Sequence, residues 1–138
     1  AASRWRCCMS LPRKLALGFV FVWFMGGGLG HFVIADFFIR IVPPWVPWPE
    51  AAVYGSGLLE ILGALGLLFA ATRRWAGIGL FVLTLCVTPA NVHMWLHPEL
   101  FPEFPAVLLG PRLVLQVLLL AVIAWSTQTR DRPVLART

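Results

Sequence analysis

Residues 51–95 read AAVYGSGLLEILGALGLLFAATRRWAGIGLFVLTLCVTPANVHMW, two long apolar runs separated by the polar stretch Thr72-Arg73-Arg74. Each run approaches the roughly 20 apolar residues that a helix needs to cross a hydrocarbon core about 30 Å thick. A connection this short forces consecutive helices to pack antiparallel against each other. The stretch therefore predicts a hairpin of two transmembrane helices, at about residues 51–71 and 75–95.

Two further apolar runs flank this hairpin, at about residues 15–36 and 106–127. The first is longer than the ~7–15 apolar residues of a signal peptide, so we expect it to be a retained helix. The chain has 138 residues, of which 59% are hydrophobic and 12% charged, a composition too apolar for a soluble domain. The sequence predicts an all-α membrane protein, a single bundle of four transmembrane helices with tails at residues 1–14 and 128–138.

Two proline-rich segments connect the outer helices to the hairpin, at residues 37–50 and 96–105. The first contains four prolines, which predict that it forms no regular helix. It also contains Trp45 and Trp48, and tryptophan is enriched where a bilayer meets water. Both segments are therefore expected to be interfacial loops.

Basic residues predict the orientation. Nine of the 11 Lys and Arg residues fall on one side of the expected topology: Arg4, Arg6, Arg13, Lys14, Arg73, Arg74, Arg130, Arg132 and Arg137. Because cytoplasmic segments carry an excess of basic residues, both termini are expected on the cytoplasmic side. A bacterial inner membrane is the default location, and an organellar membrane stays open. The basic residues form no single patch, so no nucleic-acid partner is expected.

Polar residues inside the expected helices predict a site. An ionisable side chain near the centre of a bilayer costs several kcal/mol, so it persists where it is paired, hydrated or functional. Glu60 lies about 13 Å into the second helix at ~1.5 Å per residue, near the midplane. The other candidates lie in the same half of the membrane by the same estimate. The predicted ligand-binding residues are Glu60, His31, Asn91, His93, Arg112 and Gln116.

Two interpretations of this cluster stay open. Glu60 and Arg112 could form an ion pair that holds helices together, with Gln116 and Asn91 completing its hydrogen bonds. Alternatively, the residues could line a cavity open to the non-cytoplasmic face, in which Glu60 binds or relays a proton for a ligand such as a quinone. The cofactor is otherwise unknown.

A haem held by His31 and His93 is the weaker alternative. Two histidines form no metal motif by their spacing, and no Cys-x-x-Cys-His stretch accompanies them. We therefore predict no metal site. The small residues of the second helix are expected to permit close helix packing rather than ligand binding. They are Gly55, Ser56, Gly63, Ala64 and Gly66.

Several short motifs, taken together and in order, resemble a known family. They are Gly30-His31-Phe32, Val42-Pro43-Pro44-Trp45-Val46-Pro47, Pro49-Glu50, Tyr54-x-Ser56-Gly57-x-x-Glu60-Ile61-x-Gly63, Thr72-Arg73-Arg74 and Pro89-Ala90-Asn91-x-His93. Over residues 18–127 the chain resembles the DoxX-like family of small four-helix integral membrane proteins. The resemblance implies an association with membrane redox systems, because the family is named after a subunit of a thiosulfate:quinone oxidoreductase. It also implies that His31, Glu60, Asn91 and His93 line a site.

Three functions remain as hypotheses. The first is a non-catalytic or quinone-associated subunit of a membrane oxidoreductase, whose electron-carrying centre lies in a bound cofactor or a partner subunit. The second is a structural or assembly subunit of a larger membrane complex, and the third is a small-molecule carrier. The expected partners are the lipid bilayer and either other membrane subunits or further copies of this chain. No complete catalytic motif is present, so no catalytic residue is predicted.

Overall fold

The computed structural model describes residues 9–128, which form helices and no strand. Helices α1, α3, α4 and α5 are long and apolar enough to cross a membrane. A short helix α2 follows α1, and a single 3-10 turn η1 lies between α4 and α5. Their bounds are α1 Leu11–Val33, α2 Ala35–Ile41, α3 Pro49–Leu68, α4 Arg73–Leu96, η1 Pro98–Leu100 and α5 Ala106–Thr127.

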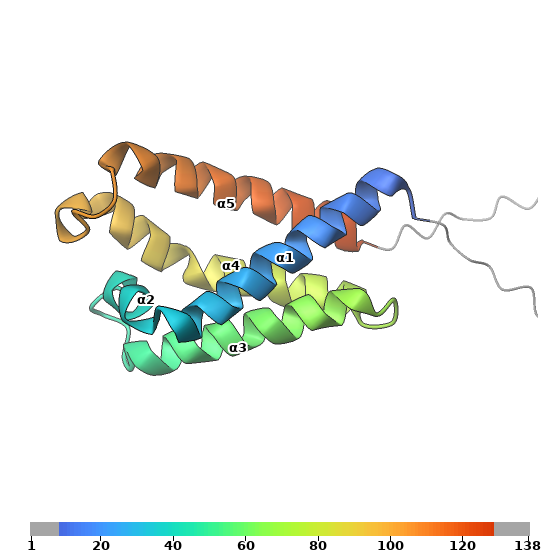
Figure 1. Cartoon of the computed structure of the whole chain (residues 1–138), viewed down its shortest axis with the longest axis horizontal. Coiled ribbons are helices and arrows are strands. Elements are labelled where there is room, and N and C mark those ends of the chain that lie inside the picture. The colour runs from blue at the N-terminus through green and yellow to red at the C-terminus, as the bar shows by residue number, and fades with distance from the viewer. Residues whose placement is uncertain (1–8, 129–138) are drawn as a thin grey trace, which may run out of the picture.

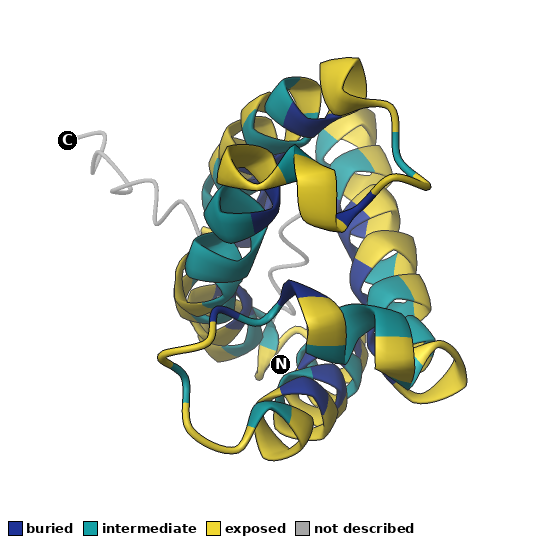
Figure 2. Ribbon diagram, turned by 90° about the vertical axis from the view of Figure 1, so that its left-hand side faces the viewer, coloured by how far each residue is buried: buried dark blue, intermediate teal, exposed yellow. Residues whose placement is uncertain are grey.

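The four long helices form a ring. Helix α1 packs against α3 and α5, and α4 packs against the same two helices. The start of α1, the α3–α4 turn and the end of α5 lie at one end of the bundle, here named the tail end (Figure 1). The loops that precede α3 and α5 lie at the opposite end, here named the loop end. Figure 2 views the bundle from the loop end and shows the exposed residues on the outside of the ring.

The outer surfaces of the long helices carry large apolar side chains. Leu58 and Leu62 of α3, Val82 of α4, and Val114 and Val117 of α5 are all exposed. Such a surface suits a hydrocarbon solvent and is unfavourable in water. The prediction of four long apolar helices is confirmed.

The predicted boundaries were less accurate than the number of long helices. Helix α3 begins at Pro49 and α4 begins at Arg73, each about two residues earlier than expected. Proline is tolerated in the first helical turn because the first amide groups have no partner within the helix. Arg73 was expected in the turn, but its backbone is helical and its side chain donates to the Leu67 carbonyl oxygen at the end of α3 (3.0 Å).

The expectation that residues 37–50 contain no helix was wrong for the part that belongs to α2. The first helix was expected to continue to residue 36, but it ends at Val33, where Ile34 leaves the helical conformation (φ −124°, ψ 46°). The first proline in residues 37–50 is Pro43, so the residues of this segment that precede Pro43 are free to be helical. Asp36 lies in the first turn of α2, where a carboxylate is favourable beside the positive end of the helix dipole.

Two apolar clusters stabilise the two ends of the bundle. Near the tail end, α1, α3, α4 and α5 bury a cluster that includes Val20, Phe24, Leu80 and Ile123. At the loop end, a smaller cluster joins α2, α4, the 96–105 loop and α5 through Ile41, Met94, Phe101 and Leu109. Five of the six polar residues predicted to form a site line one cavity in this bundle: His31, Glu60, Asn91, Arg112 and Gln116.

Hydrogen bonds and an ion pair connect the segments at each end. At the tail end, Arg13 of α1 donates from Nε to the carbonyl oxygen of Ser126 in α5 (3.0 Å). At the loop end, Arg40 of α2 pairs with Glu103, and the Phe37 and Phe104 rings lie 5.2 Å apart. At the start of α1, the Ser10 backbone carbonyl accepts hydrogen bonds from the Arg13 and Lys14 amides, and the Ser10 side chain makes no capping hydrogen bond.

Candidate functional site

A large cavity lies inside the loop-end half of the ring. Its volume is about 1040 Å³, and residues of all four long helices and of α2 line it. Most of the lining is apolar. The polar side chains belong to two opposite pairs of helices: His31, Ser56 and Glu60 come from α1 and α3, whereas Thr84, Asn91, Arg112 and Gln116 come from α4 and α5. We name these sets the acidic wall and the amide wall.

His31 is fixed within the acidic wall by hydrogen bonds. Its Nδ1 donates to the Val53 carbonyl oxygen of α3 (2.8 Å), and the Ser56 hydroxyl lies 3.0 Å from the same nitrogen. Because a carbonyl only accepts, the Nδ1 atom carries a proton in this arrangement. The second ring nitrogen, Nε2, is then free to accept or hold another proton, and it faces Glu60 at 3.8 Å from Oε1.

Glu60 is buried, yet its carboxylate is held loosely. Glu60 Oε1 lies 3.8 Å from His31 Nε2, a distance too long for a hydrogen bond. Within residues 9–128 no hydrogen bond to this carboxylate is formed. Because Glu60 lines the cavity, the unused acceptor sites of its oxygens are available to water or to a ligand.

Close contact between α1 and α3 brings these two side chains together. A Cβ atom added to Gly57 of α3 would lie 2.6 Å from the His31 Cβ atom, and one added to Gly28 of α1 would lie 2.8 Å from the Gly57 carbonyl oxygen. A Cβ atom on Gly27 would lie 2.9 Å from Glu60 Oε2. These distances leave no room for larger residues, so the glycines set the separation of the two helices at the acidic wall.

The small residues predicted on the second helix divide between packing and the cavity. Gly63 and Gly66 contact Leu80 and Ala76 of α4, as expected. Gly55 has no atom within 4 Å of an added Cβ atom and lines the cavity instead. Ser56 also lines the cavity, where its hydroxyl contacts His31. Gly55 therefore does not have the expected packing role, whereas Ser56 both contacts α1 and lines the cavity.

The amide wall is a continuous chain of hydrogen bonds between α4 and α5. Arg112 donates to Asn91 Oδ1 (3.2 Å), and Asn91 donates from Nδ2 to Gln116 Oε1 (2.6 Å). Gln116 in turn donates from Nε2 to the Thr88 hydroxyl and to the Thr84 carbonyl oxygen. Each group in this chain orients the next, so the Arg112 guanidinium is held in place by the amides of its neighbours.

Glu60 and Arg112 do not form the ion pair that one interpretation required. Glu60 faces His31 on the acidic wall, whereas Arg112 binds Asn91 and the Met94 sulfur on the amide wall (3.1 Å). The Arg112 partners are both neutral. Two ionisable groups of opposite sign therefore line one cavity from different walls without neutralising each other directly.

His93 lies away from this site. It does not line the cavity, and its ring lies 4.8 Å from that of His97 in the segment after α4. His97 faces the exposed carboxylate of Glu99. A hydrogen bond from the Glu99 backbone amide lowers the pKa of this carboxyl group below its ordinary value, and the hydrogen bond with His97 contributes less in the same direction. The prediction that His93 joins the cluster was wrong. Since His31 and His93 do not face a common cavity, the geometry also gives no support to a haem bound between them.

Thr84 and Thr88 were absent from the predicted set, although the sequence carries a signal for them. Positions 84, 88 and 91 are spaced by four and three residues, which places them on one face of a helix with Asn91. Ser56 and Glu60 are likewise four residues apart. Following the helical spacing outward from Asn91 and Glu60 identifies all three additional polar residues.

The fold and site define a class: a small helical protein with four long apolar helices around a cavity that has two polar walls. Residues 20–130 match the model of a family described as a domain of unknown function (DUF8561). The match spans most of the chain, so the protein belongs to this family. Neither a curated protein nor a solved structure matches the sequence.

Proposed function

We propose that this protein is an integral membrane protein that binds a lipophilic carbonyl compound, a quinone or its reduced hydroquinone, in the cavity between the acidic and amide walls. Its role would be that of a non-catalytic, quinone-associated subunit of a membrane redox system, in keeping with the resemblance to DoxX-like proteins. The observation that carries the proposal is the pair of unneutralised groups, Glu60 and Arg112, facing a largely apolar cavity from opposite sides.

The chemistry of the two walls matches the head of such a ligand. Arg112 carries five N–H donors and uses only part of them on Asn91 and Met94, so it can donate to a quinone carbonyl oxygen. Glu60, when ionised, can accept from a hydroquinone hydroxyl, and His31 Nε2 beside it can accept or return a proton. The apolar remainder of the cavity suits the ring and its substituents.

The proposed orientation follows from charge at the two ends of the bundle. Arg13, Lys14, Arg73 and Arg74 all lie at the tail end, whereas Arg40 lies at the loop end. We propose that the tail end faces the cytoplasm of a bacterium, and that the cavity lies in the outer half of its inner membrane. Arg4, Arg6, Arg130, Arg132 and Arg137, which contributed to the predicted orientation, lie outside the described residues.

The test is to purify the protein from its native membrane in mild detergent and to measure extractable quinone per polypeptide. Glu60→Gln and Arg112→Ala should each reduce the quinone content by about tenfold or more, because a hydrogen bond to a charged group contributes about 1.5–3 kcal/mol. Glu50→Gln and Arg40→Ala are the matched controls, because these residues carry the same charges but do not line the cavity. They should retain the wild-type content.

The same preparation addresses the second candidate, a structural or assembly subunit. Exposed tryptophans favour this alternative, since Trp45 and Trp48 at the loop end and Trp75 at the tail end present large surfaces to lipid or to a partner. The structural role would replace the proposed quinone role if two results were obtained together. Partner subunits would copurify in stoichiometric amount, and the quinone content would be no higher than that of an unrelated membrane protein.

A further inference from the structure

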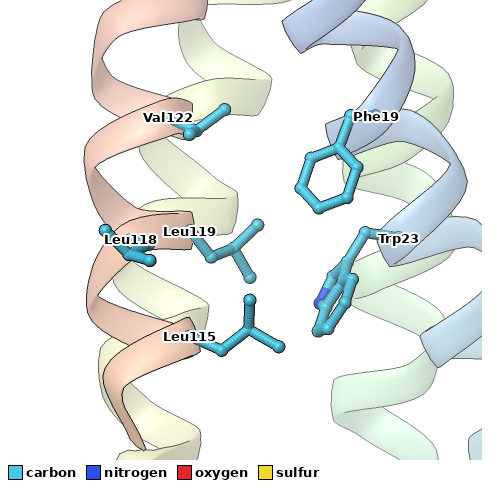
Figure 3. Close-up of a pocket in the computed structure, with 6 residues that line it drawn as sticks. All are labelled: Phe19, Trp23, Leu115, Leu118, Leu119 and Val122. Atoms are coloured by element: carbon cyan, nitrogen blue, oxygen red, sulfur yellow. The ribbon is translucent and has the colours of Figure 1, made fainter. Parts of the chain in front are cut away.

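A second, smaller hollow lies beside the large cavity, between α1 and α5. Its volume is about 170 Å³, and its lining contains no polar surface. Phe19 and Trp23 come from α1, and the remaining residues come from α5: Leu115, Leu118, Leu119 and Val122. Figure 3 shows the two aromatic rings of α1 across from Leu115, Leu119 and Val122 of α5.

This hollow adjoins the large cavity. Trp23, Leu115 and Leu119 line both spaces, so the two share a wall of side chains at the α1–α5 junction. Leu119 is buried at that junction, whereas Phe19, Trp23 and Leu118 are substantially exposed on the outer surface of the ring. The hollow therefore extends from the cavity toward the lipid-facing surface.

The helix arrangement explains why the ring is open here. Near the tail end, α1 and α5 are held together by the Arg13–Ser126 hydrogen bond and by the contacts of Val20, Leu119 and Ile123. Toward the loop end, α1 instead packs closely against α3, because Gly28 and Gly57 allow those two helices to approach each other. Figure 1 shows α1 and α5 diverging toward the loop end, and the hollow lined by Phe19 and Trp23 lies between these two helices.

We infer that this hollow is the binding site for the hydrocarbon tail of the ligand whose polar head lies between the two walls, and that the tail leaves the bundle laterally between α1 and α5. The inference deepens the proposed function and depends on it: it assigns the ligand to the class of quinones with a long hydrocarbon chain. The wholly apolar lining suits methylene groups, and its continuity with the cavity fixes the order of head and tail along one molecule.

Two quinone probes and one matched pair of variants test this site. The probes are a benzoquinone carrying a long saturated alkyl chain and the same ring carrying only methyl groups. Val122→Trp fills the hollow, whereas Val117→Trp introduces the same side chain on the exposed surface of the same helix and lines neither space. Binding of both probes to purified protein is measured by quenching of intrinsic tryptophan fluorescence, with each variant calibrated against its own ligand-free spectrum.

Val122→Trp should weaken binding of the long-chain probe by about tenfold relative to Val117→Trp, the loss expected when roughly two methylene groups lose their apolar contacts. Binding of the methyl-only probe should be the same in both variants, which also shows that Val122→Trp is folded. Equal long-chain affinities for the two variants would overturn the tail site while leaving the head site intact. Failure of the wild-type protein to bind either probe would overturn the proposed function and this inference with it.

A measurement on the unaltered protein keeps the inference testable if Val122→Trp does not fold. A long-chain benzoquinone with a diazirine in its alkyl chain is photolysed on the wild-type protein, and the labelled peptides are identified by mass spectrometry. Labels on residues 19–23 and 115–122 are expected. Labels confined to α3 and α4 would overturn the lateral path between α1 and α5.

Discussion

Gly57 on α3 should be far less tolerant of a methyl group than Gly55, two residues earlier on the same helix. A Cβ atom at Gly57 would lie 2.6 Å from His31 Cβ and 3.1 Å from the Gly28 carbonyl oxygen, whereas a Cβ atom at Gly55 would have no neighbour within 4 Å. Carbon atoms pack at about 3.5–4.0 Å, so Gly57→Ala requires a shift of roughly 1 Å between α1 and α3.

The two substitutions share every other effect. Replacing glycine by alanine within a helix gains about 1 kcal/mol at either position, so this gain cancels when the two variants are compared. The overpacking at Gly57 costs typically about 1–3 kcal/mol. We therefore expect the free energy of unfolding of Gly57→Ala to be about 1–3 kcal/mol lower than that of Gly55→Ala.

The assay is reversible unfolding in mixed micelles as the fraction of SDS is raised, followed by helical circular dichroism for both variants and the wild type. Gly55→Ala should be as stable as the wild type or more stable. The partner position on α1 provides an independent repeat, because Gly28→Ala meets Gly57 O at 2.8 Å while Gly26→Ala meets nothing within 4 Å. If Gly57→Ala is as stable as Gly55→Ala, the close contact between α1 and α3 does not set the geometry of the acidic wall.

Two further predictions concern the amide wall and the loop end. Gln116→Leu should destabilise the bundle by about 0.6–2 kcal/mol in the same assay, because it leaves Asn91 Nδ2 without its acceptor and removes the donor to the Thr88 hydroxyl, which still donates to the Thr84 carbonyl oxygen. A loss no larger than that of Val117→Leu would contradict this chain of hydrogen bonds. Glu103→Gln should cost no more than about 1 kcal/mol, since its ion pair with Arg40 is largely exposed. That cost should fade in 1 M salt, where the Debye length is about 3 Å, and a larger, salt-independent loss would show that the pair acts by another mechanism.

The number and approximate extent of the long helices were predictable because apolar run length is a strong signal. The ends of these helices were not predicted accurately. The prolines were expected to exclude helix throughout residues 37–50, although the first of them is Pro43. Helix α2 was missed for this reason. Helices α3 and α4 begin about two residues before the predicted starts, because the first backbone amides of a helix need no partner within it and both proline and arginine can occupy these positions.

Counting residues predicts how far along a helix a side chain lies, but it does not predict which way the helix is rotated about its axis. At 3.6 residues per turn, the Asn91 and His93 side chains point about 160° apart around the helix axis, on nearly opposite faces, so both cannot face one cavity. Equal depth likewise did not establish that Glu60 and Arg112 meet, because depth says nothing of distance across the bundle. Which face of each helix turns inward depends on contacts such as Gly28 against Gly57, which involve residues far apart in sequence.

The separation of Glu60 and Arg112 argues against an explanation in which the polar residues only hold helices together. Polar contacts that serve only as glue should satisfy one another, as Asn91 and Gln116 do. The structure instead leaves a carboxyl group and a guanidinium group on opposite walls, each with hydrogen-bonding capacity directed at a common cavity. Ionisable groups kept apart in apolar surroundings cost several kcal/mol, and a direct pair would reduce that cost. A ligand that accepts hydrogen bonds from Arg112 and exchanges a proton with the Glu60–His31 pair offsets the same cost while leaving the walls apart. The quinone and hydroquinone forms together meet both requirements, so the unpaired arrangement favours a head group that changes its own protonation.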